Sequence, residues 1–83
     1  MKICLKLFAT LGEYLPAGAV RNRIDIEVAP TDSIHTILER YHVPLKIVHL
    51  VLVNGHYIQP ADRASRCLQE NDELAIWPPI AGG

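Results

Sequence analysis

Apolar and polar residues alternate in three stretches of the chain, which cover residues 2–8, 23–28 and 72–77. Because successive side chains of a β-strand point to opposite faces of the sheet, this alternation predicts three half-buried strands. Residues 49–53 form a near-continuous apolar run instead, which is typical of a strand in the interior of a sheet. The side chains expected to face the core from the alternating stretches are Ile3, Leu5, Leu7, Ile24, Ile26, Val28, Leu74 and Ile76.

One segment, residues 34–41, has the apolar spacing of an amphipathic helix. Its apolar side chains fall at positions i, i+3, i+4 and i+7, which places them on one stripe. Thr31 and Asp32 precede the stripe and offer oxygens for the helix N-cap, and Pro44 ends a helix of about ten residues. A single short helix must cover its stripe with another apolar surface, and the sheet is the one candidate. The stripe consists of Ile34, Ile37, Leu38 and Tyr41.

Turn signals connect these elements. Asn54-Gly55 favours a type I′ hairpin turn, in which both central residues have positive φ, and residues 56–58 then return as a short strand. Asn71 tolerates left-handed backbone geometry and leads into the last strand. Two longer loops are expected, over residues 10–20, with a short helical turn at 11–15, and over residues 60–71.

The order of the predicted elements is strand, strand, helix, strand, short strand, strand. With one helix to cover one face of the sheet, this order predicts an α+β fold of two layers with a mixed sheet of about four or five strands. We expect the first and last strands to lie side by side and parallel at its centre, which is the ubiquitin-like β-grasp arrangement. The domain is predicted to span residues 1–77, and residues 78–83 to form a flexible, extended C-terminal Gly-Gly tail.

Composition and charge narrow the functions that such a domain can serve. The 83 residues are 49% hydrophobic, which excludes disorder, and the formal net charge is −1 with both signs mixed along the chain. The sequence contains no basic patch of the kind that would indicate binding to nucleic acid or to an anionic membrane. No apolar run approaches the roughly 20 residues of a membrane span, and the run of residues 7–11 is too short for an export signal. We therefore expect a cytoplasmic protein.

Metal and nucleophile chemistry find little support in the sequence. His35 and His42 would lie about 10 Å apart on or near the helix, and His49 and His56 about 13 Å apart across the hairpin, too far for one metal ion. We therefore expect solvated or structural histidines and no metal site. No phosphate loop, paired-carboxylate site or Ser/His/Asp pattern is visible. Two cysteines are expected to be small packing residues, Cys4 and Cys67.

The six residues from Pro78 to Gly83 carry the strongest functional signal. The last two are glycines, so the segment can pass through a channel that any side chain would block. The two prolines at its start keep the chain extended and prevent it from pairing as another strand. This pattern predicts a handle for an enzyme that acts on a C-terminal carboxylate. A Gly-Gly ending also arises by chance, and many chain ends have no role.

Trp77 stands at the start of this tail. In a regular last strand its side chain would face away from Leu74 and Ile76. Two arrangements are open at this point. The tryptophan is either exposed, as an anchor for a partner at the root of the tail, or folded back over the edge of the core.

Three stretches carry a resemblance to a known family, and it extends over the whole chain. Residues 5–15 look like the first strand and turn of the β-grasp sulfur carriers, and residues 51–55 are similar to their central strand and turn. The closing residues 71–83 most closely resemble the small subunit of molybdopterin synthase, although thiamin-pathway carriers also end in Gly-Gly. The family usually has Gly-Asp where this chain has Asn71-Asp72, and often has Phe where Trp77 stands.

The resemblance implies that the chain is a substrate of other enzymes and does not catalyse a reaction alone. An ATP-dependent adenylating enzyme would activate the carboxylate of Gly83, and sulfur from a persulfide donor would displace AMP to leave a thiocarboxylate. Gly82 would fit the channel of the enzyme, and a larger catalytic subunit of molybdopterin synthase would use the sulfur. No bound cofactor is expected, since the activating partner uses the ATP. The residues that would dock and direct the tail are Pro78, Pro79, Ile80 and Ala81.

Three other functions stay open. The chain could carry sulfur to another acceptor, such as a thiazole, an amino acid or tRNA. It could be a ubiquitin-like modifier joined to lysines through Gly83, which isopeptide-linked adducts in cells would reveal. It could also be an interaction module with an incidental tail, in which case no adenylating partner would activate its C-terminus.

Overall fold

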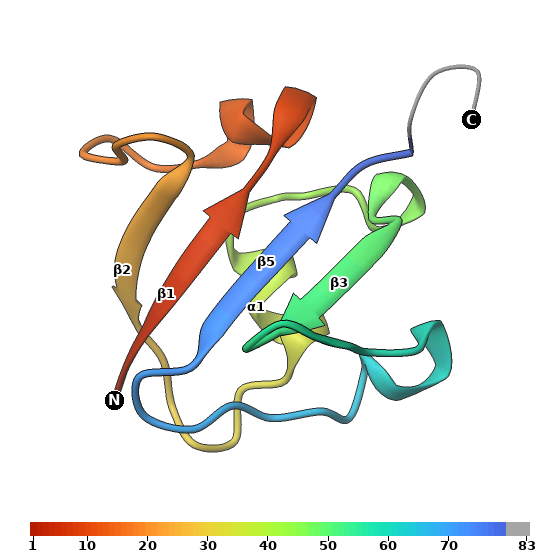
Figure 1. The fold of residues 1–83 in the computed structure, drawn as a ribbon. Coiled ribbons are helices and arrows are strands. Elements are labelled where there is room, and N and C mark those ends of the chain that lie inside the picture. Colours follow the sequence, from red (N-terminus) through yellow and green to blue (C-terminus); the bar gives the residue numbers. More distant parts are fainter. Residues whose placement is uncertain (80–83) are drawn as a thin grey trace.

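The computed structural model describes residues 1–79. Its elements are β1 (Lys2–Leu7), η1 (Ala9–Tyr14), β2 (Arg23–Glu27), α1 (Ile34–Arg40), η2 (Leu45–Ile47), β3 (Leu50–Val53), β4 (His56–Tyr57), η3 (Pro60–Asp62) and β5 (Glu73–Trp77), where η marks a 3₁₀ helix. The strands form one sheet in the order β2-β1-β5-β3-β4, and α1 covers one of its faces (Figure 1). At its centre β1 and β5 run parallel, whereas the other neighbouring strands are antiparallel. The predicted α+β, β-grasp fold is therefore confirmed.

The core lies between α1 and the sheet. The parallel register pairs Leu5 with Leu74, so both side chains share the face beneath α1. Ile24 and Tyr41, which the sequence pattern assigns to the core, are partly exposed, because Ile24 lies on the edge strand β2 and Tyr41 follows the last residue of α1. The side chains less than 2% exposed are Ile3, Leu5, Leu7, Leu11, Ile34, Ile37, Leu38, Val51, Val53, Leu74 and Ile76.

The helix α1 is shorter than predicted and has a different cap. The hydroxyl oxygen of Ser33 accepts a hydrogen bond from the Thr36 N–H at 3.1 Å, so Ser33 is the N-cap. The prediction of Thr31 or Asp32 as the cap is wrong, because the Asp32 carboxylate is engaged by the turn that precedes the helix. At the other end His42 adopts φ 62°, a left-handed conformation that terminates the helix. The helix therefore has seven residues.

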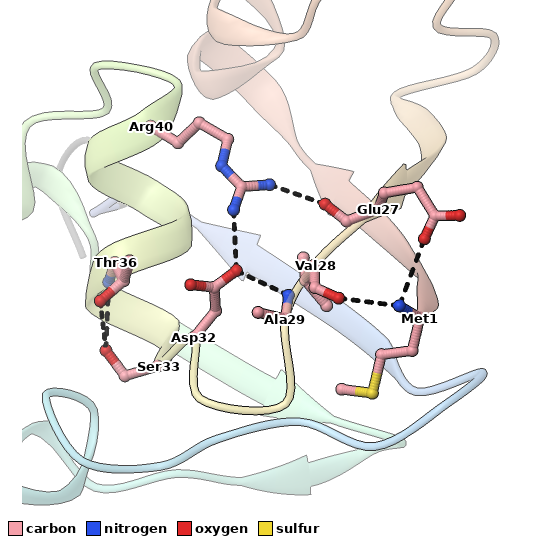
Figure 2. A network of polar contacts seen from close by, with 8 residues as sticks. All are labelled: Met1, Glu27, Val28, Ala29, Asp32, Ser33, Thr36 and Arg40. Atoms are coloured by element: carbon pink, nitrogen blue, oxygen red, sulfur yellow. Dashed lines mark hydrogen bonds and ion pairs between the residues drawn. The ribbon is translucent and has the colours of Figure 1, made fainter.

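A polar network joins the end of α1 to the end of β2 and to the N-terminus (Figure 2). The Arg40 guanidinium donates to the Asp32 carboxylate at 2.8 Å and to the Glu27 carbonyl at 2.7 Å. The Met1 ammonium group binds the Glu27 carboxylate at 3.3 Å. Asp32 also accepts the Ala29 N–H at 2.8 Å. The hydrogen bond from the Ala29 N–H is the main cause that lowers the pKa of Asp32. The Arg40 guanidinium lowers this pKa further, whereas burial of the carboxylate opposes the shift.

The substitution Asp32→Asn is expected to make the stability of the domain less dependent on pH. Because the folded-state pKa of Asp32 lies below its ordinary value of 3.8, the charged form stabilises the fold. This contribution is complete above pH 3.8 and is lost as the pH falls through the lower folded-state pKa. Urea unfolding at a series of pH values should show an advantage of the wild type over Asp32→Asn that shrinks below pH 3.8. A difference that stays constant with pH would contradict the assignment.

The Asn54-Gly55 turn has the predicted geometry and a second role. φ is 51° at Asn54 and 81° at Gly55, as a type I′ turn requires, and Asn71 has the predicted left-handed conformation with φ 69°. The Asn54 amide group donates to the buried Asp72 carboxylate at 2.8 Å. The side-chain carbonyl oxygen of Asn54 accepts a hydrogen bond from the Glu73 N–H at 2.9 Å. The hairpin turn thereby fixes the point at which β5 begins.

Candidate functional site at the root of the C-terminal tail

The strand β5 ends at Trp77, and the chain continues into two prolines. The Ile76 carbonyl accepts the Phe8 N–H from the β1 side at 3.0 Å. The Trp77 carbonyl accepts the His49 N–H from the β3 side at 2.9 Å. Proline has no N–H, so the pairing cannot continue, and Pro78 and Pro79 lie beyond the end of the central strand β5 (Figure 1). Of the predicted tail, Pro78 and Pro79 are described, whereas Ile80, Ala81, Gly82 and Gly83 lie outside the described residues.

The Trp77 side chain is half-buried on the open face of the sheet, the face that α1 does not cover. Its ring stacks on Phe8, with ring centroids 4.4 Å apart and planes 12° from parallel. The parallel pairing of Leu7 with Ile76 explains the stack, because the next residue on each strand then points to the same open face. The outcome lies between the two arrangements left open by the sequence. The ring faces away from the core, but the Phe8 ring covers one of its sides.

Apolar side chains around this stack form a patch on the open face of the sheet. The strand β3 contributes residues that alternate with the buried positions beneath α1, and β4 contributes Tyr57, which is 54% exposed. Beside the patch, Lys6 forms an ion pair with Glu73 at 2.9 Å. Aromatic side chains bordered by polar groups are typical of protein-binding surfaces. The open-face patch consists of Phe8, Leu50, Leu52, Tyr57, Ala75 and Trp77.

The residue that follows Phe8 has a strained backbone. Ala9 is exposed and adopts φ 52°, in the left-handed region that opposes any residue with a Cβ atom. This conformation turns the chain sharply from β1 into η1, where the Leu11 N–H donates to the Phe8 carbonyl at 3.0 Å. The strain therefore lies directly beside the aromatic stack.

The substitution Ala9→Gly is expected to raise the free energy of unfolding by about 1 kcal/mol, because glycine lacks the Cβ atom that opposes positive φ. Ala61 offers a matched control, since it is also exposed in a 3₁₀ helix but does not have positive φ. We expect Ala61→Gly to lower the free energy of unfolding by about 0.5–1 kcal/mol. Urea unfolding measures both changes, and the same sign at both positions would contradict the strain.

Arg63 supports the root of the tail through His49, a role that was not expected from the sequence. It is 4% exposed, and its guanidinium donates to the Ile58 carbonyl at 3.0 Å and to the His49 carbonyl at 3.1 Å. The N–H of His49 in turn binds the Trp77 carbonyl. Arg63 therefore holds the segment that borders the root of the tail. No signal in the sequence distinguishes this arginine from a solvated one, since it lies in a loop of mostly exposed residues.

The remaining candidate residues do not form a reactive site. Within residues 1–79, no group of three or more His, Cys, Asp or Glu side chains could hold a metal ion. Cys4 is half-buried, but Cys67 is exposed, so its predicted packing role is wrong; the neighbouring Leu68 takes the buried position. The part of the chain that the structure describes also contains no helix long and apolar enough to cross a membrane.

The comparisons with known proteins decide the family. The model of the ThiS family matches residues 5–83, which include the open-face patch and the entire tail. The chain belongs to the ThiS family. The expectation of a β-grasp sulfur-carrier family is thus confirmed. None of the curated proteins compared with the chain matches it.

Solved structures of the same fold come from archaea and bacteria. SAMP1 from Haloferax volcanii is 25% identical, with a TM-score of 0.68 and coverage of 100% of both chains. The HVO 2177 protein of Haloferax volcanii is 23% identical, with a TM-score of 0.76 and coverage of 100% of this chain and 87% of that one. A complex of subunits 1 and 2 of the molybdopterin-converting factor from Helicobacter pylori 26695 contains a chain that is 17% identical, with a TM-score of 0.62 and coverage of 100% of both chains. The last two likenesses concern the fold alone.

Proposed function

We propose that this ThiS-family protein carries sulfur as a thiocarboxylate on Gly83 and donates it for the formation of molybdopterin. The observation that carries the proposal is the family match, which extends through the Gly-Gly ending. The described root of the tail supports it, because the folded domain ends in two prolines beside an apolar patch that suits a protein partner. The cytoplasm is the expected compartment, since it supplies ATP and keeps thiols such as Cys67 reduced.

The chemistry explains why an activating enzyme is needed. A terminal carboxylate has a pKa near 3.5, so at neutral pH it is ionised and resists nucleophiles. Attack of the carboxylate on ATP would release pyrophosphate and form an acyl-adenylate with AMP as its leaving group. The terminal sulfur of a persulfide donor would then displace AMP, and a thiol would reduce the resulting acyl disulfide to the thiocarboxylate. Every step takes place in partner enzymes, and this chain contributes the carbonyl carbon of Gly83.

Each tail residue has a proposed part in that reaction. Gly82 and Gly83 lack side chains, so they would let the backbone approach the nucleotide closely. The residues from Pro78 to Ala81 would dock and direct the tail. Six residues extended like polyproline II span about 19 Å, which would reach a recessed active site while the domain stays outside. A larger catalytic subunit would receive the sulfur, as the Helicobacter pylori structure is described as a complex of two subunits.

A second function is favoured by a specific observation. Three of the similar structures are small archaeal modifier proteins, two of them from Haloferax volcanii and one from Methanosarcina acetivorans. In that alternative a lysine amine would attack the acyl-adenylate at Gly83, release AMP and form an isopeptide bond. Both functions share the activation step and differ in the nucleophile that follows it.

Intact mass spectrometry tests the proposal. The protein purified from its own host, or incubated with an adenylating enzyme, ATP, a persulfide donor and a reducing thiol, should gain about 16 Da at Gly83, because sulfur replaces one oxygen. Fragment masses must place the change on Gly83, since oxidation of Met1 or a cysteine adds a similar mass. Peptides that carry the tail on a lysine would favour the modifier instead. A protein that stays unmodified after incubation with the activating system would contradict both functions.

A further inference from the structure

We propose that Phe8 is a positioning residue for the C-terminal tail, and that it acts through its stack on Trp77. The two rings lie 4.4 Å apart and nearly parallel on the open face of the sheet. Trp77 directly precedes Pro78, the first proline of the tail. The consequence for the reaction rests on the proposed function, whereas the mechanical role of Phe8 does not depend on it.

The contacts of Phe8 act on both the backbone and the side chain at the end of β5. Its N–H donates to the Ile76 carbonyl at 3.0 Å, and its ring covers one side of Trp77. On the opposite side, the His49 N–H binds the Trp77 carbonyl at 2.9 Å, and Arg63 holds His49 by its carbonyl at 3.1 Å. The last strand residue is therefore held from β1 and from β3, with its side chain fixed by Phe8.

Proline transmits this fixed orientation to the tail. Its ring restricts its own φ to about −65° and confines the preceding residue to extended backbone. With Trp77 held by its neighbours and followed by Pro78-Pro79, few torsions can change the direction in which the chain departs. The Phe8–Trp77 stack therefore sets the direction in which Pro78 and Pro79 leave the sheet before any partner binds.

A tail root that is already ordered affects how tightly the activating enzyme binds this protein more than it affects the chemical step. An enzyme that captures a tail with a free root must order that root, and each residue it fixes lowers the affinity by about tenfold. Once the tail is bound, the terminal glycine occupies the same place in either case. The substitution Phe8→Ala should therefore raise the KM of the activating enzyme for this protein about tenfold and leave kcat unchanged. The substitution Phe8→Tyr keeps an aromatic ring and should keep the wild-type KM.

The isolated protein allows a direct test, because Trp77 is the single tryptophan of the chain. Fluorescence excited at the red edge of the tryptophan absorption, where tyrosine does not absorb, reports on Trp77 alone. We expect the anisotropy of the wild type and of Phe8→Tyr to decay with the tumbling of the whole domain. Phe8→Ala should add a fast component from local motion of the freed ring. Tyr41→Ala is the matched control, since it removes another partly buried aromatic residue that follows α1 and does not stack on Trp77. Unchanged anisotropy in Phe8→Ala, with the domain folded, would overturn the proposal.

Kinetics of adenylation then separate positioning from direct contact with the enzyme. If Phe8 acts through Trp77, the variants Phe8→Ala and Trp77→Ala are non-additive, and the double variant has the KM of Trp77→Ala alone. Additive increases in KM would mean that Phe8 binds the enzyme itself and would overturn the proposal. A wild type that no activating enzyme adenylates would refute the proposed function, and the anisotropy would still decide the role of Phe8. If Phe8→Ala does not fold, Phe8→Leu provides the same comparison, because it also lacks the aromatic ring.

Discussion

Deletion of Gly83 is expected to abolish thiocarboxylate formation while the domain remains folded. The deletion moves the reactive carboxylate back by one residue, about 3.3–3.6 Å, and displacements of even 1 Å can lower a reaction rate by about 100-fold. The buried hydrophobic residues of the described chain all lie between Ile3 and Ile76, so the core keeps its packing. Mass spectrometry after incubation with the activating system measures the modification, and urea unfolding measures the stability.

Gly82→Ala tests the same tail with its length intact. One added methyl group should block a channel shaped for Gly-Gly and lower the rate of adenylation by about 100-fold. Ala81→Gly is the matched control, since it removes a methyl group one residue earlier and adds no bulk to the channel, so it should lower the rate far less than Gly82→Ala does. Sulfur transfer by the Gly83 deletion would end the proposed function. Equal rates for Gly82→Ala and the wild type would show that no narrow channel receives the tail.

The fold is largely predictable because its signals are local. Alternation locates the long strands, and Asn54-Gly55 specifies a hairpin because that turn needs two positive φ angles. The cap of α1 was not predictable, since Thr31, Asp32 and Ser33 all offer oxygens in succession. The choice depends on the Ala29 N–H and on Arg40, which both bind the Asp32 carboxylate and leave Ser33 as the cap.

The candidate site likewise has one part that the sequence predicts and another part that it does not. The tail is a prediction from composition, because prolines and glycines act through the backbone. The Phe8–Trp77 stack depends on the register between the first and last strands, which lie 69 residues apart in the sequence (77 − 8) and meet only in the folded sheet. Neither a phenylalanine nor a tryptophan in the sequence indicates which side chain it will stack on. The strain at Ala9 is equally hidden, since alanine is not a residue that favours positive φ.

Replacement of Arg63 by methionine is expected to destabilise the domain by about 3 kcal/mol, the largest effect among the stability variants considered. The change keeps an apolar stem but leaves the buried Ile58 carbonyl and the partly buried His49 carbonyl without their donor. An unsatisfied buried group costs about 1–3 kcal/mol. Arg63→Lys keeps the charge and offers a single compact donor group, so it should recover about half of the loss. Urea unfolding of the three proteins gives the free energies.

Arg66 is the matched control for this measurement, because it stands three residues later, is exposed and donates to the nearby Cys67 carbonyl. Arg66→Met is expected to change the free energy of unfolding by less than about 0.5 kcal/mol. Equal effects of the two methionine variants would show that water replaces the Arg63 guanidinium without cost. In the expected case Arg63→Met also loosens His49, and Trp77 then loses support from β3. Its fluorescence anisotropy in the folded variant should therefore decay faster than in Arg66→Met, which links this buried arginine to the direction of the tail.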